Sequence, residues 1–187
     1  MSVQRCNWAT SDDLLVRYHD QEWGKPNHDD RRHFEHLCLE IMQSGLSWLT
    51  VLRKRQSFAN AFMQYDLQKI AAMTELDVER LMLDESIIRN KRKIEAIIHN
   101  ARVVRDMQEK GFRLSVFFWS YVNGVPLKNK WLNQEQLPAK SDLSEQIAKD
   151  MRKNGFKFVG PTNIYAHLQS MGIINDHLQS CFRYNQV

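Results

Sequence analysis

Apolar residues recur at intervals of three and four along most of the chain, which is the spacing of one face of an α-helix. The clearest stretch covers 29–45, where an apolar face is followed by a glycine that ends the pattern: Phe34, Leu37, Cys38, Ile41, Met42 and Gly45. The same spacing predicts helices over 11–23, 46–65, 66–84, 86–110, 112–122, 141–155 and 160–172. Residues suited to cap a helix N-terminus open two of these segments: Ser11, Asp12 and Ser47.

Residues 123–139 lack a steady period and contain two of the four prolines, so we expect a loop there. The pattern does not explain Trp131 within it. No segment alternates apolar and polar residues convincingly enough to predict a strand, and no repeat of fixed period is visible. The sequence therefore predicts an all-α fold of many short helices, and a length of 187 residues fits one domain over 1–187.

Composition narrows the class of protein. Hydrophobic residues make up 43% and charged residues 26%, with 7 Gly and 4 Pro, which favours a folded, helix-rich protein over a disordered one. The apolar runs are too short for a membrane span or a secretory signal, so we expect a cytoplasmic protein with no membrane partner. A net charge of +4 is compatible with a polyanionic partner but is common in other proteins too.

The cysteines and histidines suggest a metal site. Three cysteines are an odd count with no export signal, which argues against a disulfide framework. On a helix, His177 and Cys181 would lie on one face about 6 Å apart. Cys38 falls in an apolar face, as a buried thiol does, whereas Cys6 and His19 would complete a closed, structural Cys₂His₂ zinc site. Competing histidines and unligated thiols remain alternatives; the histidines are His28, His33, His36, His99 and His167.

Large aromatic residues accompany a carboxylate that falls near an apolar helix face. Glu40 lies three residues after Leu37 and two before Met42, where an unpaired carboxylate is costly unless it faces a ligand. Aromatic walls with one carboxylate suit a flat, cationic or amino-bearing heterocycle. The alternative is a tryptophan-rich core with Glu40 bonded to backbone or an arginine. The aromatic residues concerned are Trp8, Tyr18, Trp23 and Trp48.

A basic segment follows a short polar break between two predicted helices. Backbone amides and basic side chains at such a break can hold a phosphate. The Gly-x-Gly turn that would strengthen this prediction is absent from the segment, and a solvated helix face is the alternative. The basic residues are Arg89, Lys91, Arg92 and Lys93.

Taken in order, the segments RCNW, YHDQEWG, QSGLSWLTVLRKR, GFKFVGPT and NDH resemble the bacterial DNA-3-methyladenine glycosylase I family, from Cys6 to Cys181. The resemblance implies an all-α fold of the helix-hairpin-helix glycosylase superfamily. It also implies monofunctional excision of 3-methyladenine from alkylated double-stranded DNA, with the free base as product, and we expect a monomer. A structural zinc is implied at residues matching Cys6, His19, His177 and Cys181.

The resemblance also implies roles for the aromatic residues. Glu40 would be the catalytic carboxylate and would also recognise the base, Tyr18 and Trp48 would stack on it, and Trp8 and Trp23 would lie nearby. Methylation at N3 makes adenine cationic, so aromatic walls gain cation–π attraction and Glu40 opposes the charge. The base must leave the duplex, and a cationic purine is a good leaving group, so water suffices as nucleophile and no lysine is assigned that role.

Two further sets of residues are expected to contact DNA. Gly45 would approach the backbone and Leu46 would enter the vacated base stack, as apolar wedges do in duplex-bending proteins. The basic segment Arg89 to Lys93 would contact phosphates.

Five residues depart from the family pattern, and we expect them to alter the shape of the pocket: Leu15, Ile41, Met42, Asn163 and His167. Two alternatives to the enzyme are a non-catalytic module of the same fold that binds alkylated bases, and a zinc-stabilised helical interaction protein unrelated to DNA. An intact Glu40 favours the enzyme over the first, and the dense aromatic motif argues against the second.

Overall fold

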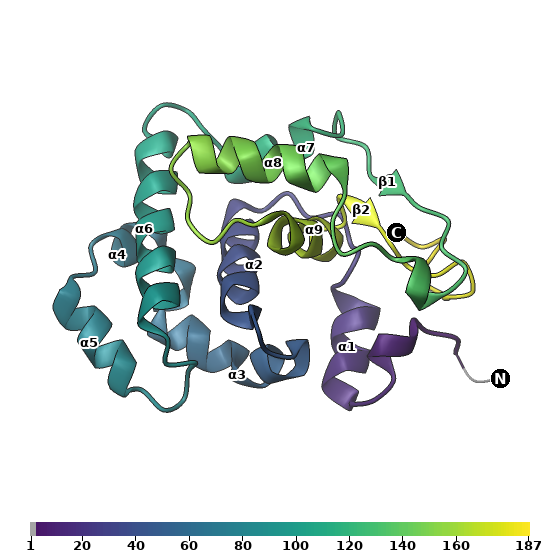
Figure 1. Cartoon of the computed structure of the whole chain (residues 1–187), viewed down its shortest axis with the longest axis horizontal. Coiled ribbons are helices and arrows are strands. Elements are labelled where there is room, and N and C mark those ends of the chain that lie inside the picture. Colours follow the sequence, from purple (N-terminus) through teal and green to yellow (C-terminus); the bar gives the residue numbers. More distant parts are fainter. Residues whose placement is uncertain (1–2) are drawn as a thin grey trace.

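The computed structural model describes residues 3–187, and helices dominate that range (Figure 1). The helices are α1 (Asp13–Gln21), α2 (Asp30–Gln43), α3 (Trp48–Ala61), α4 (Leu67–Ala71), α5 (Glu75–Leu83), α6 (Lys91–Gln108), α7 (Leu114–Ser120), α8 (Asp142–Lys153) and α9 (Pro161–Ser170). Short 3₁₀ turns are η1 (Asn7–Ala9), η2 (Met63–Tyr65) and η3 (Gln134–Gln136). Two strands, β1 (Leu127–Lys128) and β2 (Ile174–Asn175), pair in parallel. The mostly helical prediction is confirmed.

Side-chain caps start two helices, α1 and α3, where the sequence predicted them. Asp12 accepts from the backbone N–H of Leu14 at the start of α1, and Ser47 accepts from that of Thr50 at the start of α3. These bonds satisfy amides that lack a partner in the first helical turn.

Three predicted boundaries were wrong, each for a local reason. The segment 66–84 forms two helices because Thr74 and Asp77 form a capping box that starts α5. The helix expected over 46–65 ends at Ala61, and the next residues of η2 have positive φ. The helix expected from 86 begins only at Lys91, after Asn90 caps it. The two short strands carry no alternating pattern because each spans two residues.

Helix α2 occupies the centre of the molecule and packs against α3, α6, α7 and α9 (Figure 1). All of its residues from 33 to 42 are buried, so it is surrounded on every side. A polar side chain on this helix therefore meets either protein or a cavity.

The N-terminal segment, α1 and the C-terminal segment form a second, smaller apolar cluster, and Trp48 packs against both it and the main core. Gly172, with φ of 68°, ends α9 so close to the 24–27 segment that a Cβ there would lie 2.3 Å from the backbone of Lys25 and Pro26. Glycine thereby brings the end of α9 against the segment that follows Trp23. Within residues 3–187, every helix is too short or too polar to cross a membrane.

Candidate functional site

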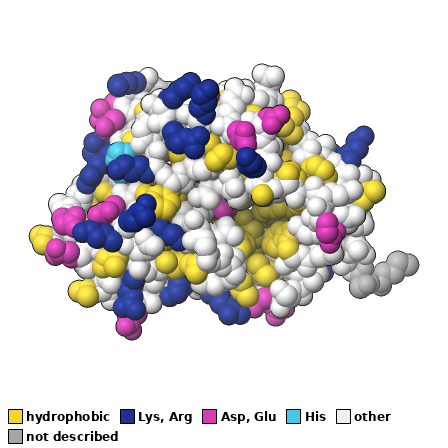
Figure 2. Space-filling model, in the orientation of Figure 1, with side chains coloured by type: hydrophobic (Ala, Val, Ile, Leu, Met, Phe, Trp, Pro, Cys, Tyr) yellow, Lys and Arg dark blue, Asp and Glu magenta, His cyan; other side chains and the backbone are white. Residues whose placement is uncertain are grey.

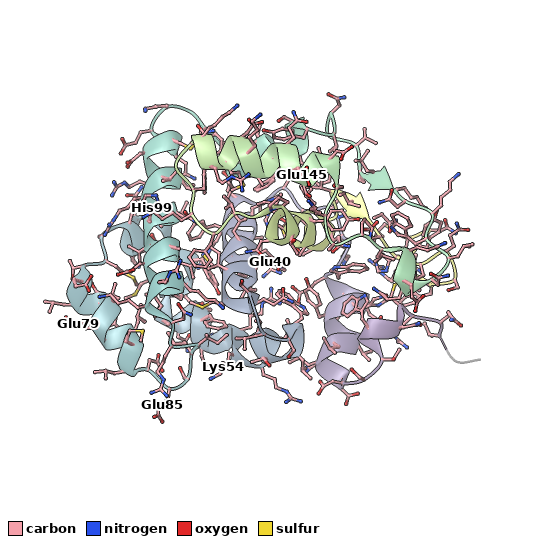
Figure 3. The ribbon with its side chains drawn as sticks, in the orientation of Figure 1. Glu40, Lys54, Glu79, Glu85, His99 and Glu145 are labelled. Atoms are coloured by element: carbon pink, nitrogen blue, oxygen red, sulfur yellow. The ribbon has the colours of Figure 1, made fainter. Side chains whose placement is uncertain are left out.

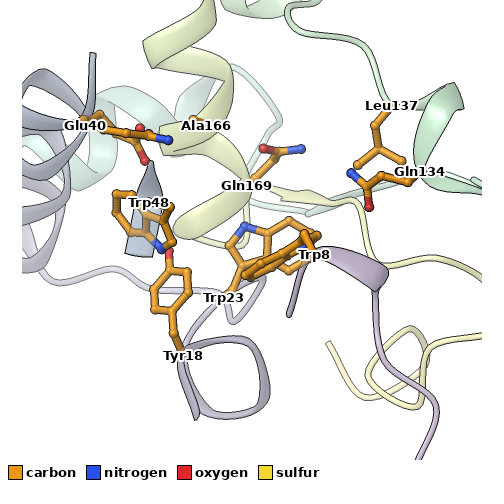
Figure 4. A pocket seen from close by; sticks show the side chains of 10 residues that line it. Trp8, Tyr18, Trp23, Glu40, Trp48, Gln134, Leu137, Ala166 and Gln169 are labelled. Carbon is orange, nitrogen blue, oxygen red and sulfur yellow. The ribbon is translucent and has the colours of Figure 1, made fainter. Parts of the chain in front are cut away.

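A cavity of about 260 Å³ opens between α1, α2, α9 and η3 (Figure 4). In Figure 2 its mouth is the hollow lined by apolar side chains, with lysine and arginine gathered mostly to one side of it. Ten residues line it: Trp8, Tyr18, Trp23, Glu40, Gln43, Trp48, Gln134, Leu137, Ala166 and Gln169. All four aromatic residues singled out in the sequence, together with Glu40, are among them.

The aromatic walls hold one another in place by tilted and edge contacts. The rings of Trp8 and Trp23 meet edge to face with centroids 5.1 Å apart, and those of Tyr18 and Trp48 lie 5.2 Å apart at 52°. Such geometries suit the electrostatics of aromatic pairs. The result is a preformed apolar slot of the kind that accepts a flat ring.

Glu40 projects from the buried helix α2 near the middle of the molecule (Figure 3). Its side chain is 4% exposed, and no donor from residues 3–187 is hydrogen-bonded to its carboxylate. Burial raises the pKa of Glu40 to about 8. The alternative that Glu40 bonds to backbone or an arginine is therefore wrong, and the carboxyl is available to a ligand.

Sequence reasoning missed half of the lining. Gln43 lies three residues after Glu40 on α2, so helical spacing could have found it. Ala166 and Gln169 share a face of α9 in the same way. Gln134 and Leu137 lie in and beside η3, inside the segment expected to be a loop, where no pattern marks them.

The hydrogen bonds of Trp131 explain its position in the loop. Its indole N–H donates to Asp176 Oδ1 at 2.6 Å, and its carbonyl accepts from the backbone N–H of Gln179. These bonds fix the segment that carries Gln134 and Leu137 to the C-terminal part of the chain.

None of the five residues that depart from the family pattern lines the cavity, so any effect they have on its shape would be indirect. Leu15 packs in the smaller apolar cluster, whereas Ile41 and Met42 face the main core. Asn163 donates to the Phe158 carbonyl, and His167 bonds His33 at 3.0 Å. The cavity-facing residue of that part of α9 is Ala166.

Four residues from opposite ends of the chain form a buried cluster able to hold a metal ion: Cys6, His19, His177 and Cys181. Cys181 Sγ lies 3.4 Å from His19 Nε2 and 3.5 Å from His177 Nδ1, and Cys6 Sγ lies 3.7 Å from His177 Nδ1. All four ligand atoms lie within 4.8 Å of one another. His177 and Cys181 come together through turns after β2, not on one helix, which corrects that part of the prediction.

Further contacts orient the ligand atoms. His19 Nδ1 bonds Asp20 Oδ1 at 2.8 Å, so its Nε2 faces the cluster. His177 Nε2 lies 3.2 Å from the Trp23 carbonyl, so its Nδ1 faces the cluster. Carboxylate and carbonyl partners of this kind orient metal-bound histidines. Since Trp23 also lines the cavity, the cluster supports one of the cavity walls.

The basic segment divides into exposed and buried residues. Arg89, Lys91 and Arg92 are exposed at the start of α6. Lys93 is 6% exposed, and its ammonium donates to the carbonyls of Met42 and Ser44 at 2.9 and 2.7 Å. Lys93 therefore ties α6 to the end of α2, which corrects its prediction as a phosphate contact.

Gly45 and Leu46 form the turn between α2 and α3. Gly45 has φ of 82°, a conformation that glycine adopts without strain. Leu46 is 43% exposed.

Comparison with known proteins gives one consistent family. The family model of methyladenine glycosylase matches residues 8–184. A DNA-3-methyladenine glycosylase of Haemophilus influenzae is 44% identical over 95% of this chain and 96% of its own. A crystal structure of 3-methyladenine DNA glycosylase I superposes with a TM-score of 0.94 at 46% identity, covering 96% of this chain and 98% of the other. The structure of a variant of such an enzyme in complex with 3-methyladenine superposes with a TM-score of 0.91 at 34% identity, covering 95% of this chain and 96% of the other.

Proposed function

The chain belongs to the methyladenine glycosylase family, and from this premise we propose that its aromatic cavity receives a 3-methyladenine base flipped out of DNA. Its reaction is hydrolysis of the bond between that base and deoxyribose in alkylated DNA. We also propose a single glycosylase domain of the helix-hairpin-helix superfamily; the match over residues 8–184 supports the single domain. The observation that carries the proposal is Glu40, a buried carboxyl without a protein donor in an aromatic slot.

The chemistry of the lesion matches this environment. A base methylated at N3 carries positive charge, which the faces of Tyr18 and Trp48 attract. Glu40 accepts from the exocyclic amine and, once ionised, opposes the charge of the ring. A neutral adenine lacks the charge, so the slot favours the damaged base.

Excision needs little chemistry from the protein because the cationic base leaves readily. The cavity stabilises the departing purine and the positive charge that develops on the sugar, and water is the nucleophile. Within residues 3–187 no lysine lines the cavity, which supports a monofunctional glycosylase that forms no covalent amine intermediate.

The metal cluster fits zinc. With Zn–S near 2.3 Å and Zn–N near 2.0 Å, tetrahedral angles separate sulfur from nitrogen by about 3.5 Å. Three of the four sulfur–nitrogen distances, 3.4, 3.5 and 3.7 Å, agree with that value. Four protein ligands leave no open position, so zinc bound there would be structural. It would join the two ends of the chain.

Contacts to DNA would come from two elements beside the cavity. Gly45 would allow the duplex to approach, and Leu46 would fill the space left by the flipped base. Arg89, Lys91 and Arg92 would contact phosphates. Lys54 supports the turn before α6 by donating to the carbonyls of Glu85 and Ser86.

The first test is release of free 3-methyladenine from methylated duplex DNA under single-turnover conditions. We expect release by the intact protein and at least a tenfold loss in Glu40→Gln, because the amide cannot oppose the cation. Glu109→Gln, an exposed carboxylate at the end of α6 that does not line the cavity, is the control. Binding of alkylated DNA without release would instead support the non-catalytic module.

Leu46→Ala tests the wedge separately. We expect slower release from duplex DNA but little change from single-stranded DNA, where no stack must be filled. Leu76→Ala, a 76% exposed leucine on α5, should change neither rate. Full activity of Leu46→Ala on duplex DNA would refute the wedge and leave the glycosylase proposal intact.

A further inference from the structure

Asp176 is a buried carboxylate, and each of its two oxygens accepts hydrogen bonds from two side-chain donors. Oδ1 accepts from Asn129 Nδ2 at 2.7 Å and from the Trp131 indole at 2.6 Å. Oδ2 accepts from the Tyr165 hydroxyl and from Gln169 Nε2 at 2.7 Å. The side chain is 1% exposed, so these four donors replace its water.

This carboxylate fixes the orientation of Gln169. The amide nitrogen of Gln169 donates to Asp176 Oδ2, so the amide oxygen of Gln169 points away from Asp176. Figure 4 shows that oxygen on the side of Trp48 and Glu40. Gln169 lines the cavity, and no donor from residues 3–187 is hydrogen-bonded to its Oε1. The cavity thus contains a second oriented acceptor besides Glu40.

We propose that Gln169, held by Asp176, selects bases with an amino group at position 6 and rejects those with an oxygen there. The inference rests on the proposed function, because it concerns the base in the same cavity. A 6-amino group has two N–H bonds, one for Glu40 and one for Gln169 Oε1. A 6-oxo group offers only lone pairs, which would face an acceptor that Asp176 prevents from turning.

Binding of two free bases isolates this effect. 3-Methyladenine and 3-methylhypoxanthine differ in the substituent at position 6, and both can be titrated by quenching of the cavity tryptophans. We expect the wild-type protein to bind 3-methyladenine more tightly. In Gln169→Met the Kd of 3-methyladenine should rise by up to about tenfold, the loss of one hydrogen bond between neutral groups. The Kd of 3-methylhypoxanthine should stay unchanged or fall.

Asn129→Leu is the matched control, since Asn129 also donates to Asp176 but does not line the cavity. It should lower stability as Gln169→Met does, yet keep the wild-type ratio of the two Kd values. Gln169→Ala, which removes the amide without adding volume, provides a second variant should the methionine disturb packing.

The inference is overturned if both Gln169 variants keep the wild-type ratio of the two Kd values, whether or not binding of both bases becomes weaker. It is also overturned if Asn129→Leu changes the ratio as much as they do, since the effect would then be structural. A wild-type protein that shows the binding preference but releases no base from DNA would refute the proposed function and leave the role of Gln169 standing.

Discussion

At the scale of single residues, Glu40 combines two properties: it is buried among aromatic rings, and its pKa is raised from 4.5 to about 8 by that burial. Between these values the folded protein retains a proton that the unfolded chain has lost. Stability from this group is therefore fully present below about pH 4.5 and declines as pH rises toward 8. The ligand-free carboxyl costs stability at the pH where it can ionise.

Glu40→Gln removes this dependence. Between pH 6.0 and 7.5 the free energy of unfolding of the wild type should fall relative to the variant by about 2 kcal/mol, from 1.36 kcal/mol per pH unit. Urea unfolding of both proteins at the two pH values measures the difference. A difference independent of pH would show that Glu40 has an ordinary pKa.

Replacing the buried histidines His33 and His36 by leucine should change the free energy of unfolding in opposite directions. Neither ring nitrogen of His36 has a protein partner within residues 3–187, whereas His33 bonds both His167 and the Asn27 carbonyl. His36→Leu should raise the free energy of unfolding by about 1 kcal/mol, because a desolvated polar ring is replaced by an apolar side chain. His33→Leu should lower it by about 1–3 kcal/mol, because two partners lose their bonds. Urea unfolding at pH 7 tests this order, and the reverse order would contradict it.

At the scale of elements, the start of α6 shows how a helix divides one basic run into two roles. Successive residues point about 100° apart, so Arg92 faces solvent and Lys93 faces the core. Burial of Lys93 lowers the pKa of its ammonium, and the two carbonyls at the end of α2 compensate by accepting from it. The neighbouring Arg92 is exposed to solvent.

Substitution of each by methionine should separate these roles. Arg92→Met should reduce the slope of log binding constant against log salt by about 0.9, the loss of one phosphate contact, with little change in stability. Lys93→Met should lower the free energy of unfolding by about 1–3 kcal/mol and leave the slope unchanged. DNA binding at several salt concentrations, with urea unfolding, measures both. Equal salt slopes for Arg92→Met and the wild type would remove Arg92 from the DNA contacts.

At the scale of the whole molecule, the cluster of Cys6, His19, His177 and Cys181 joins segments separated by more than 150 residues. Trp23 packs on His177 with ring centroids 4.6 Å apart and also lines the cavity. Loss of the cluster would therefore loosen both chain ends and one wall of the cavity.

Removal of metal should show this coupling. We expect one equivalent of zinc in the purified protein, and a chelator or Cys181→Ser should lower its Tm by more than 10 °C, because metal binding contributes folding free energy. Cys38→Ala is the control, since Cys38 is buried outside the cluster. Metal content and thermal unfolding are measured on the same samples. An unchanged Tm in the metal-free protein would contradict the proposal.

The sequence by itself determined most of the helices, two of their caps, the four possible metal ligands, Glu40 and the aromatic walls. These follow from local physics: helical spacing places residues on faces, and few residue types can bind a soft metal or stack on a base. The resemblance selected the ligand set from several possible histidines.

Only the tertiary structure decided which residues complete the site. Gln134, Leu137 and Gln169 reach the cavity because Asp176 and Trp131 draw distant segments together, and no spacing along the chain encodes such contacts. Lys93 is a similar case, because its position in a basic segment does not predict that its ammonium donates to the carbonyls of Met42 and Ser44. Local pattern depends on neighbours within a few residues, whereas a cavity depends on residues that meet only after the chain has packed.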